Sequence, residues 1–356
     1  MESSTQARNI LVAPLNWGLG HATRCIPIIK ALLQNEFVPI LASDGAALEL
    51  LKKEFPQLLA LELPSYNIEY PEDGKKFKWK MLKNAPLIFE AIRSEKKLVK
   101  KWVTEYSLCG ILSDNRLGVI SKKVPSIFIT HQLNVLSGST TWISSKMHQH
   151  IIGKFTECWI PDFEGKPNLS GKLGHRKGEI ENLKHIGPLS RFTRQSVPVR
   201  YDLLILLSGP EPQRTILQHQ LGIEALQSDK KILFVKGIIE ESQKIEQSGN
   251  VTFYNFMESE QLQKAINESA IVVCRSGYTS IMDLAVLHKP CYFIPTPGQY
   301  EQEYLAKRLQ KQGLAPYSKQ DEFTFENLSE IKHYEGLPEI ENPIHWKHLF
   351  CLFERK

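Results

Sequence analysis

The chain has 356 residues, of which 42% are hydrophobic and 23% charged, and its formal net charge is +5. This length predicts two domains, and no apolar run is long enough to predict a transmembrane helix. The segment Met1–Asn9 is polar and lacks the apolar stretch of a secretory signal, so we expect a cytoplasmic protein. The six cysteines are scattered without metal-binding spacing, which argues against disulfides and a zinc site.

A glycine-bearing turn lies near the start of the chain. Ile10–Ala13 is apolar and predicts a strand, Ala22–Leu33 predicts a helix, and Gly18, Gly20 and His21 lie between them. Such a turn is the layout of a nucleotide or phosphate site, because glycine lets the backbone approach a ligand and free helix-start N–H groups face an anion. The run matches neither GxGxxG nor the P-loop. An ordinary β–α turn with a hydrogen-bonded histidine is the alternative.

The stretch Lys75–Lys101 is basic. It holds ten Lys or Arg residues against Glu90 and Glu95, with aromatic and aliphatic residues such as Phe77 and Trp79 between them. This pattern fits a face for a membrane surface or an anionic acceptor, and it equally fits a solvated helix with one buried stripe. No nucleic-acid-binding motif accompanies the charge, so we expect no nucleic-acid partner.

Strand-like and helix-like segments alternate in both halves, which predicts α/β domains with parallel sheets. A break near Pro188–Pro198 separates the halves, and we expect domains at residues 1–190 and 191–335, followed by a helical tail at 336–356. The predicted strands are Ile10–Ala13, Val38–Ala42, Gly110–Ser113, Ser126–Thr130, Cys158–Ile160, Leu203–Leu207, Ile232–Val235, Val251–Tyr254, Ile271–Cys274 and Cys291–Ile294.

A second strand–turn–helix unit lies in the C-terminal half. The strand Ile271–Cys274 leads into Arg275, Ser276 and Gly277, and the predicted helix Tyr278–Leu287 contains Asp283. Amides at a helix start favour an anion such as a diphosphate. A carboxylate such as Asp283 can accept hydrogen bonds from ribose hydroxyls. The next strand ends in a proline-rich turn, which precedes Glu301, Gln302 and a predicted helix at Tyr304–Gln310.

This second unit resembles the C-terminal half of glycosyltransferase family 28. The turn ending in Gly20-His21 looks like that family's Gly-rich loop, Gly187-Pro188-Leu189-Ser190-Arg191 is similar to its G-N-P-x-R element, and Thr130–Asn134 is similar to its H-E-Q-N run. The resemblance spans about residues 9–315. It implies the GT-B architecture, in which two Rossmann-like domains with parallel sheets face each other across a cleft. It also implies that the C-terminal helix crosses back to the first domain.

The resemblance also implies roles for individual residues. His21 is the candidate general base, since histidine titrates near neutrality, and Asp114 would orient or replace it. The loop Ser208–Arg214 departs from the family's glycine-rich form, because Pro210 and Pro212 supply no N–H groups for a phosphate. Asp283 stands where the family usually has Glu. The candidate donor-binding residues are Arg191, Ser208, Gly209, Arg214, Arg275, Ser276, Gly277, Asp283, Glu301 and Gln302, and the candidate acceptor-binding residues are Gly18, Gly20, His131 and Asn134.

We therefore expect an inverting transferase that moves a sugar, with N-acetylglucosamine among the candidates, from a UDP-sugar substrate to an unidentified acceptor. No D-x-D pattern marks a metal site, so the expected transfer needs neither metal nor cofactor. Because the stretch Lys75–Lys101 is basic, the hypothesis also includes a lipid-linked acceptor and peripheral contact with the inner face of the membrane. A nucleotide-sugar 2-epimerase or hydrolase, and a non-catalytic nucleotide-sugar-binding protein, are the alternatives.

Overall fold

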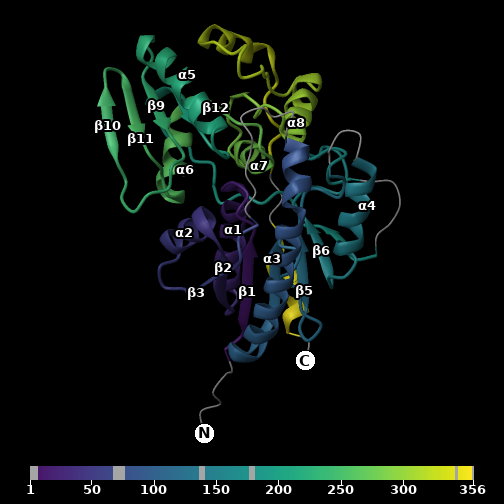
Figure 1. Ribbon diagram of the computed structural model, residues 1–356. Helices are drawn as coiled ribbons and strands as arrows, with labels where there is room; N and C mark the ends of the chain where they lie inside the picture. Colours follow the sequence, from purple (N-terminus) through teal and green to yellow (C-terminus); the bar gives the residue numbers. More distant parts are fainter. Residues whose placement is uncertain (1–6, 67–76, 136–140, 176–180, 341–343, 355–356) are drawn as a thin grey trace.

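The computed structural model describes residues 7–66, 77–135, 141–175, 181–340 and 344–354, with the side chains of 77–85, 141, 143 and 144 left out. The chain forms two α/β units, each built on its own sheet, and helices α1 (Gly20–Gln34) and α7 (Tyr278–Val286) meet where the two units face each other (Figure 1). No helix in these ranges combines the length and apolarity that crossing a bilayer requires.

The first unit is built on seven strands, and every neighbouring pair is parallel. The order β3-β2-β1-β4-β5-β6-β7 reverses direction between β1 and β4. Parallel sheets of this doubly wound kind bind ligands beyond the carboxyl ends of the strands at such a reversal. The strands are β1 (Asn9–Pro14), β2 (Val38–Ser43), β3 (Ala60–Glu62), β4 (Leu108–Asp114), β5 (Ser126–Ile129), β6 (Glu157–Ile160) and β7 (Leu183–His185).

The second unit has a six-stranded sheet in the order β10-β11-β9-β8-β12-β13. All pairs are parallel except β10–β11, an antiparallel pair at one edge. The reversal of strand order lies between β8 and β12. The strands are β8 (Tyr201–Leu206), β9 (Ile232–Val235), β10 (Ile245–Ser248), β11 (Val251–Tyr254), β12 (Ser269–Cys274) and β13 (Cys291–Phe293).

Helices connect these strands. Helix α1 illustrates why they form: most of its apolar residues are buried on the sheet and against the other unit, and nine of its fifteen residues are buried. The first unit contains α1 (Gly20–Gln34), α2 (Gly45–Glu54), α3 (Phe77–Glu105) and α4 (Thr141–Ile152). The second contains α5 (Gln213–Gln227), α6 (Ser259–Asn267), α7 (Tyr278–Val286), α8 (Tyr300–Lys311) and the 3₁₀ helix η3 (Phe325–His333).

The C-terminal residues pack against the first unit. Helix α9 (Trp346–Phe350) and the 3₁₀ helix η4 (Cys351–Phe353) bring Phe350 and Phe353 edge-on to Phe37, with ring centroids 5.7 and 6.1 Å away. The ring of Phe353 lies so close to Gly110 in β4 that a Cβ there would meet it at 2.2 Å. Only glycine therefore fits at position 110.

The fold class expected from the sequence is confirmed: the chain is mixed α/β with parallel sheets in two Rossmann-like units. Ten of the strands lie where the apolar runs predict them. The sequence interpretation missed β3, β7 and β10, which are three or four residues long and only partly buried or exposed. It also placed the starts of two helices too late: α1 begins at Gly20 and not at Ala22, and α8 begins at Tyr300 and not at Tyr304.

Candidate active site

The candidate site lies where the carboxyl ends of the two sheets face each other. From the first unit come the β1–α1 turn, the end of β4 and the segment after β5. From the second come the starts of α7 and α8. The start of α1 touches the start of α7, where Thr279 Oγ1 donates to the Gly20 carbonyl over 3.1 Å. A Cβ on Gly20 would lie 3.1 Å from Thr279 Oγ1, so the glycine permits this close approach.

His21 and Asp114 form the centre of the site. His21 Nδ1 lies 2.7 Å from Asp114 Oδ1, and Arg24 donates from Nε and Nη2 to both oxygens of the same carboxylate. Asp114 and Arg24 are buried, whereas 14% of the His21 side chain is exposed. Burial by itself would raise the pKa of Asp114, but the Arg24 guanidinium and His21 outweigh it and hold that pKa at about 2. Asp114 is therefore a carboxylate at neutral pH.

The electrostatics of His21 favour its neutral form. Burial lowers the pKa of His21 below the ordinary value of 6.5, and Arg24 lowers it further, although Asp114 opposes both. A contact of 2.7 Å between Nδ1 and an ionised carboxylate requires a proton on Nδ1, since two lone pairs would otherwise repel. The Nε2 lone pair of neutral His21 is then available to take a proton.

His131 joins this centre to the second unit. Its Nδ1 lies 2.7 Å from Arg24 Nη1, and its Nε2 lies 2.8 Å from Glu301 Oε1 in α8. Gln132 donates to the other oxygen of Glu301. The His131 ring also stacks on Tyr278, with centroids 4.5 Å apart and planes at 9°. Burial would raise the pKa of Glu301, but His131, together with His21 and Arg24, outweighs burial and lowers that pKa.

The Ser276–Gly277 turn immediately precedes α7, and Ser276 is buried whereas Gly277 is partly exposed. Ser276 Oγ donates to the Gln302 carbonyl over 2.9 Å, and Gln302 Oε1 accepts from the Thr296 amide at 2.8 Å. Gly277 is the residue before α7, and no side chain caps that helix. The α7 N-terminus is thus a place where backbone amides and the helix dipole favour an anion.

Asp283 lies in a second buried cluster under the inter-unit linker. Its Oδ1 accepts from Ser190 Oγ at 2.6 Å. Arg191 donates to Ser259 Oγ over 3.0 Å and lies 3.7 Å from the carboxylate of Glu54. Burial raises the pKa of Asp283 to about 6, against the opposing influence of Arg191. Both side chains are buried, and these contacts include neither His21 nor Asp114.

Asp283→Asn is expected to raise the free energy of unfolding at about pH 8 by roughly 1–3 kcal/mol. The pKa is about 6 in the folded protein and 3.8 without burial, so ionisation is harder in the folded state. The stability cost of Asp283 therefore appears as pH rises above about 4 and is complete above about 6. Urea unfolding of both proteins at pH 8 and pH 4 is the measurement. A loss of stability of Asp283→Asn at pH 8 would contradict this prediction and show that the Asp283 carboxylate is net stabilising.

Two candidate cations for the donor phosphates have partners within the protein. Arg275 is buried and donates to the carbonyls of Ile294, Pro295 and Gln213 and to Gln320 Oε1. Burial lowers its pKa to about 9, and no carboxylate of the described residues pairs with it. Arg214 is paired with Glu211 and donates to the Lys236 carbonyl. Arg275 therefore links the loops around the Ser276–Gly277 turn through its hydrogen bonds. The charge of Arg214 is already compensated by Glu211.

The remaining candidate residues lie in loops. Gly18 and Gly209 have φ of 75° and 105°, a backbone conformation that favours glycine, and Gly209 follows Ser208 beyond the end of β8. Asn134 Nδ2 donates to the carbonyls of Lys172 and His175 at 2.6 and 3.1 Å, so its amide is used within the first unit. No group of three or more metal-ligating side chains occurs among the described residues.

Arg24 is the site residue that the sequence interpretation missed. It follows His21 by three positions, so both lie on one face of α1. Its position in the sequence, between apolar residues such as Ala22 and Cys25 that are buried, could have indicated a buried arginine. A buried arginine requires an acceptor, and this would have predicted a nearby carboxylate.

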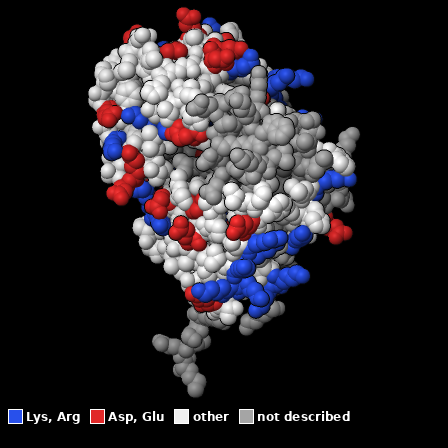
Figure 2. All heavy atoms as spheres, viewed as in Figure 1, with Lys and Arg blue, Asp and Glu red and all other residues white. Residues whose placement is uncertain are grey.

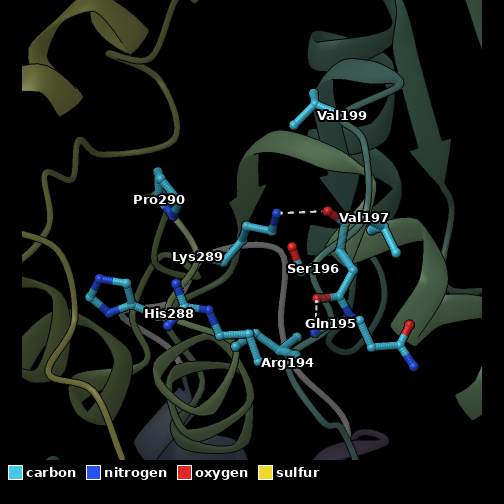
Figure 3. A pocket seen from close by; sticks show the side chains of 10 residues that line it. Arg194, Gln195, Ser196, Val197, Val199, His288, Lys289 and Pro290 are labelled. Carbon is cyan, nitrogen blue, oxygen red and sulfur yellow. Dashed lines mark hydrogen bonds between the residues drawn. The ribbon is translucent and has the colours of Figure 1, made fainter.

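A hollow of about 510 Å³ lies elsewhere, between the linker and the turn after α7 (Figure 3). Arg194 and Lys289 line it, and Lys289 donates to the Asn267 carbonyl over 3.0 Å. Its residues precede β8, β12 and β13, and they therefore lie at the amino ends of these strands, whereas Ser276 follows the carboxyl end of β12. This hollow is therefore separate from the His21 centre.

Comparison with known proteins agrees with this geometry. Residues 213–337 match the model of the glycosyltransferase family 28 C-terminal domain. UDP-N-acetylglucosamine–N-acetylmuramyl-(pentapeptide) pyrophosphoryl-undecaprenol N-acetylglucosamine transferases are similar over much of their length. The Haemophilus ducreyi protein is 25% identical over 76% of each chain. A Haemophilus influenzae protein is 26% identical over 70% of this chain and 69% of its own.

Solved structures share the fold. Acinetobacter baumannii MurG aligns with a TM-score of 0.55 and 14% identity, covering 98% of this chain and all of that one. A UDP-glucosyltransferase from Polygonum tinctorium aligns with a TM-score of 0.55 and 13% identity over 88% and 85% of the two chains. The chain is therefore a glycosyltransferase with the GT-B fold that resembles family 28, and the match to that family's C-terminal domain covers residues 213–337.

Proposed function

We propose that this glycosyltransferase moves a sugar from a UDP-sugar to an acceptor hydroxyl in one inverting displacement, without a metal ion or cofactor. The observation that carries the proposal is the 2.7 Å contact between His21 and Asp114. With its Nδ1 proton held by Asp114, neutral His21 can take the acceptor's proton on Nε2 as that oxygen attacks the anomeric carbon. Asp114 is buried and bound to Arg24, so it orients the base and does not replace it.

The donor would bind at the start of α7. Support comes from the uncapped helix N-terminus after Ser276 and Gly277, which suits a diphosphate. Asp283 is the candidate partner of the ribose hydroxyls, a role in which the nucleotide would replace the hydroxyl of Ser190. Glu301 and Gln302 are the candidates for the sugar hydroxyls. The names of the relatives specify UDP-N-acetylglucosamine and a pyrophosphoryl-undecaprenol acceptor, and we propose the same classes here.

A transfer assay tests this function. The full chain is incubated with radiolabelled UDP-N-acetylglucosamine and N-acetylmuramyl-(pentapeptide) pyrophosphoryl-undecaprenol, and label is followed into the lipid phase. The α-linked donor should give a β-linked product, which NMR of the product distinguishes. Free UDP without acceptor would instead show a hydrolase, an epimerised donor would show an epimerase, and binding without turnover would show a sensor.

We expect turnover to be insensitive to chelation. The described residues offer no cluster of metal ligands, and the proposed mechanism uses backbone amides at the start of α7 on the diphosphate. The measurement compares initial rates in excess EDTA with rates in magnesium or manganese. Activity that disappears in EDTA and returns with either ion would exclude the metal-independent route.

The proposed lipid-linked acceptor is supported by one face of the first unit. The exposed cations Arg93, Lys96, Lys97, Lys100 and Lys101 lie on the second half of α3. Figure 2 shows Lys and Arg gathered over that part of the helix. Leu87 and Phe89, earlier on α3, are 51% and 58% exposed. Phe77 and Trp79, which the sequence hypothesis also used, have side chains outside the described residues. Exposed apolar groups beside cations suit an anionic membrane surface.

We expect weak, salt-sensitive binding to anionic vesicles. Each basic residue near such a surface contributes on the order of 1 kcal/mol. The triple change Lys96→Glu, Lys97→Glu, Lys100→Glu should abolish cosedimentation with phosphatidylserine vesicles at low salt. A matched triple reversal of exposed lysines in the second unit, at Lys230, Lys264 and Lys311, should leave it intact. Equal sedimentation of the α3 variant and the control would exclude this surface.

A further inference from the structure

Arg24 is a buried arginine that contacts three titratable side chains of the site. Only 1% of the residue is exposed. Its Nε and Nη2 donate to the two oxygens of Asp114, its Nη1 lies 2.7 Å from His131 Nδ1, and its Nη2 lies 2.9 Å from His21 Nδ1. One side chain of α1 therefore contacts both histidines of the site and the carboxylate of Asp114 at the end of β4.

The contact with Arg24 determines the tautomer of His131. A guanidinium only donates hydrogen bonds and stays charged, so His131 Nδ1 must accept with its lone pair. The ring proton of neutral His131 then lies on Nε2, which is 2.8 Å from Glu301 Oε1 and donates to that carboxylate. The bonds run in one direction, from Arg24 to His131 to Glu301, across the two units.

His21 must have the opposite tautomer. Asp114 is ionised and can only accept, so the 2.7 Å contact places the His21 proton on Nδ1. Arg24 cannot donate to an Nδ1 that carries a proton, and it therefore acts on His21 through Asp114 and through its own charge. That charge opposes protonation of the imidazole. The other charged or titratable groups near His21 are His131 after β5 and Glu301 in α8.

We propose that Arg24 is a positioning residue that holds His21 and His131 in opposite tautomers and so links the base of the first unit to Glu301 of the second. His21 then has a free Nε2 lone pair, as a base requires. His131 has an Nε2–H that donates to Glu301 of the second unit. The role assigned to His21 rests on the proposed transfer function. The two tautomers rest on the contacts alone.

Nitrogen-15 NMR of the histidine rings in the full chain, without substrates, is the test. Neutral His131 should show a protonated Nε2 and His21 a protonated Nδ1, with resonances assigned from His21→Gln and His131→Gln spectra. In Arg24→Gln the His131 ring should become a mixture of tautomers, and the pKa of His21 should rise, because a neighbouring positive charge is removed. A His131 that is protonated on Nδ1 in the unaltered protein would overturn the proposal.

Arg116→Gln is the matched control. Arg116 is also buried, follows Asp114 by two residues and pairs with Asp44 and Glu95. Among the described residues, its hydrogen bonds and ion pairs involve neither histidine. It should cost stability but leave both histidine spectra unchanged. If Arg24→Gln does not fold, Arg24→Lys replaces it. Lysine keeps the charge but cannot span Asp114 and His131, so the His21 pKa should stay near its original value while His131 loses its single tautomer.

The kinetic readout separates this proposal from the transfer function. If the chain transfers sugar, the acid limb of its kcat/KM profile should move to higher pH in Arg24→Gln by the same shift, and not in Arg116→Gln. A uniform loss of rate with no shift, together with unchanged spectra, would make Arg24 a merely structural residue. The spectra retain their meaning if no transfer is found, since they need no substrate.

Discussion

His21→Ala is expected to lower kcat by about 100-fold or more while the affinity for UDP stays nearly constant. The variant removes the imidazole whose Nε2 would take the acceptor's proton, but it leaves the α7 N-terminus, where the diphosphate would bind, unchanged. Steady-state rates with the lipid acceptor and calorimetry with UDP measure the two effects separately.

The control for this variant is His219→Ala, an exposed histidine on α5 in the second unit, which should keep normal turnover. The unaltered protein should lose activity as pH falls through the pKa of His21, which lies below 6.5. Normal turnover in His21→Ala would exclude His21 as the base and reassign it to structure.

Asp114→Ala is expected to destabilise the fold by about 3–5 kcal/mol, because it leaves the Arg24 guanidinium buried without a carboxylate. Urea unfolding near pH 7 measures this loss. The double variant Arg24→Met, Asp114→Ala should lose less than the sum of the two single changes, since no unpaired charge then remains. A loss below about 1 kcal/mol in Asp114→Ala would contradict a strongly coupled pair.

The pH dependence of this pair has a definite sign. The pKa of Asp114 is about 2 in the folded protein and 3.8 without its partners, so the folded state favours the carboxylate. Its contribution is fully present above about pH 4 and is lost as pH falls toward about 2. Asp283, with a raised pKa, has the opposite effect. Two buried aspartates of one chain therefore respond to substitution in opposite directions, which makes each a control for the other.

Much of the fold could be predicted from local patterns. Ile10–Ala13 and Ile271–Cys274 are apolar runs between turn residues, and both form buried parallel strands followed by a turn and a helix. The short edge strand β10 could not be predicted in this way, because its four residues are exposed and have no apolar alternation to signal pairing. The resemblance to family 28 and the enzyme class followed from motifs within one or two turns of these strands.

The sequence by itself therefore determined the α/β class, the two Rossmann-like units and the resemblance to family 28, since these depend on periodicity and on residues close together in the chain. Tertiary structure decided which side chains meet. Arg24 and Asp114 are 90 residues apart, His131 and Glu301 are 170 apart, and Ser190 and Asp283 are 93 apart. These pairings, and the pKa shifts that they cause, arise from burial and proximity, which no local pattern encodes.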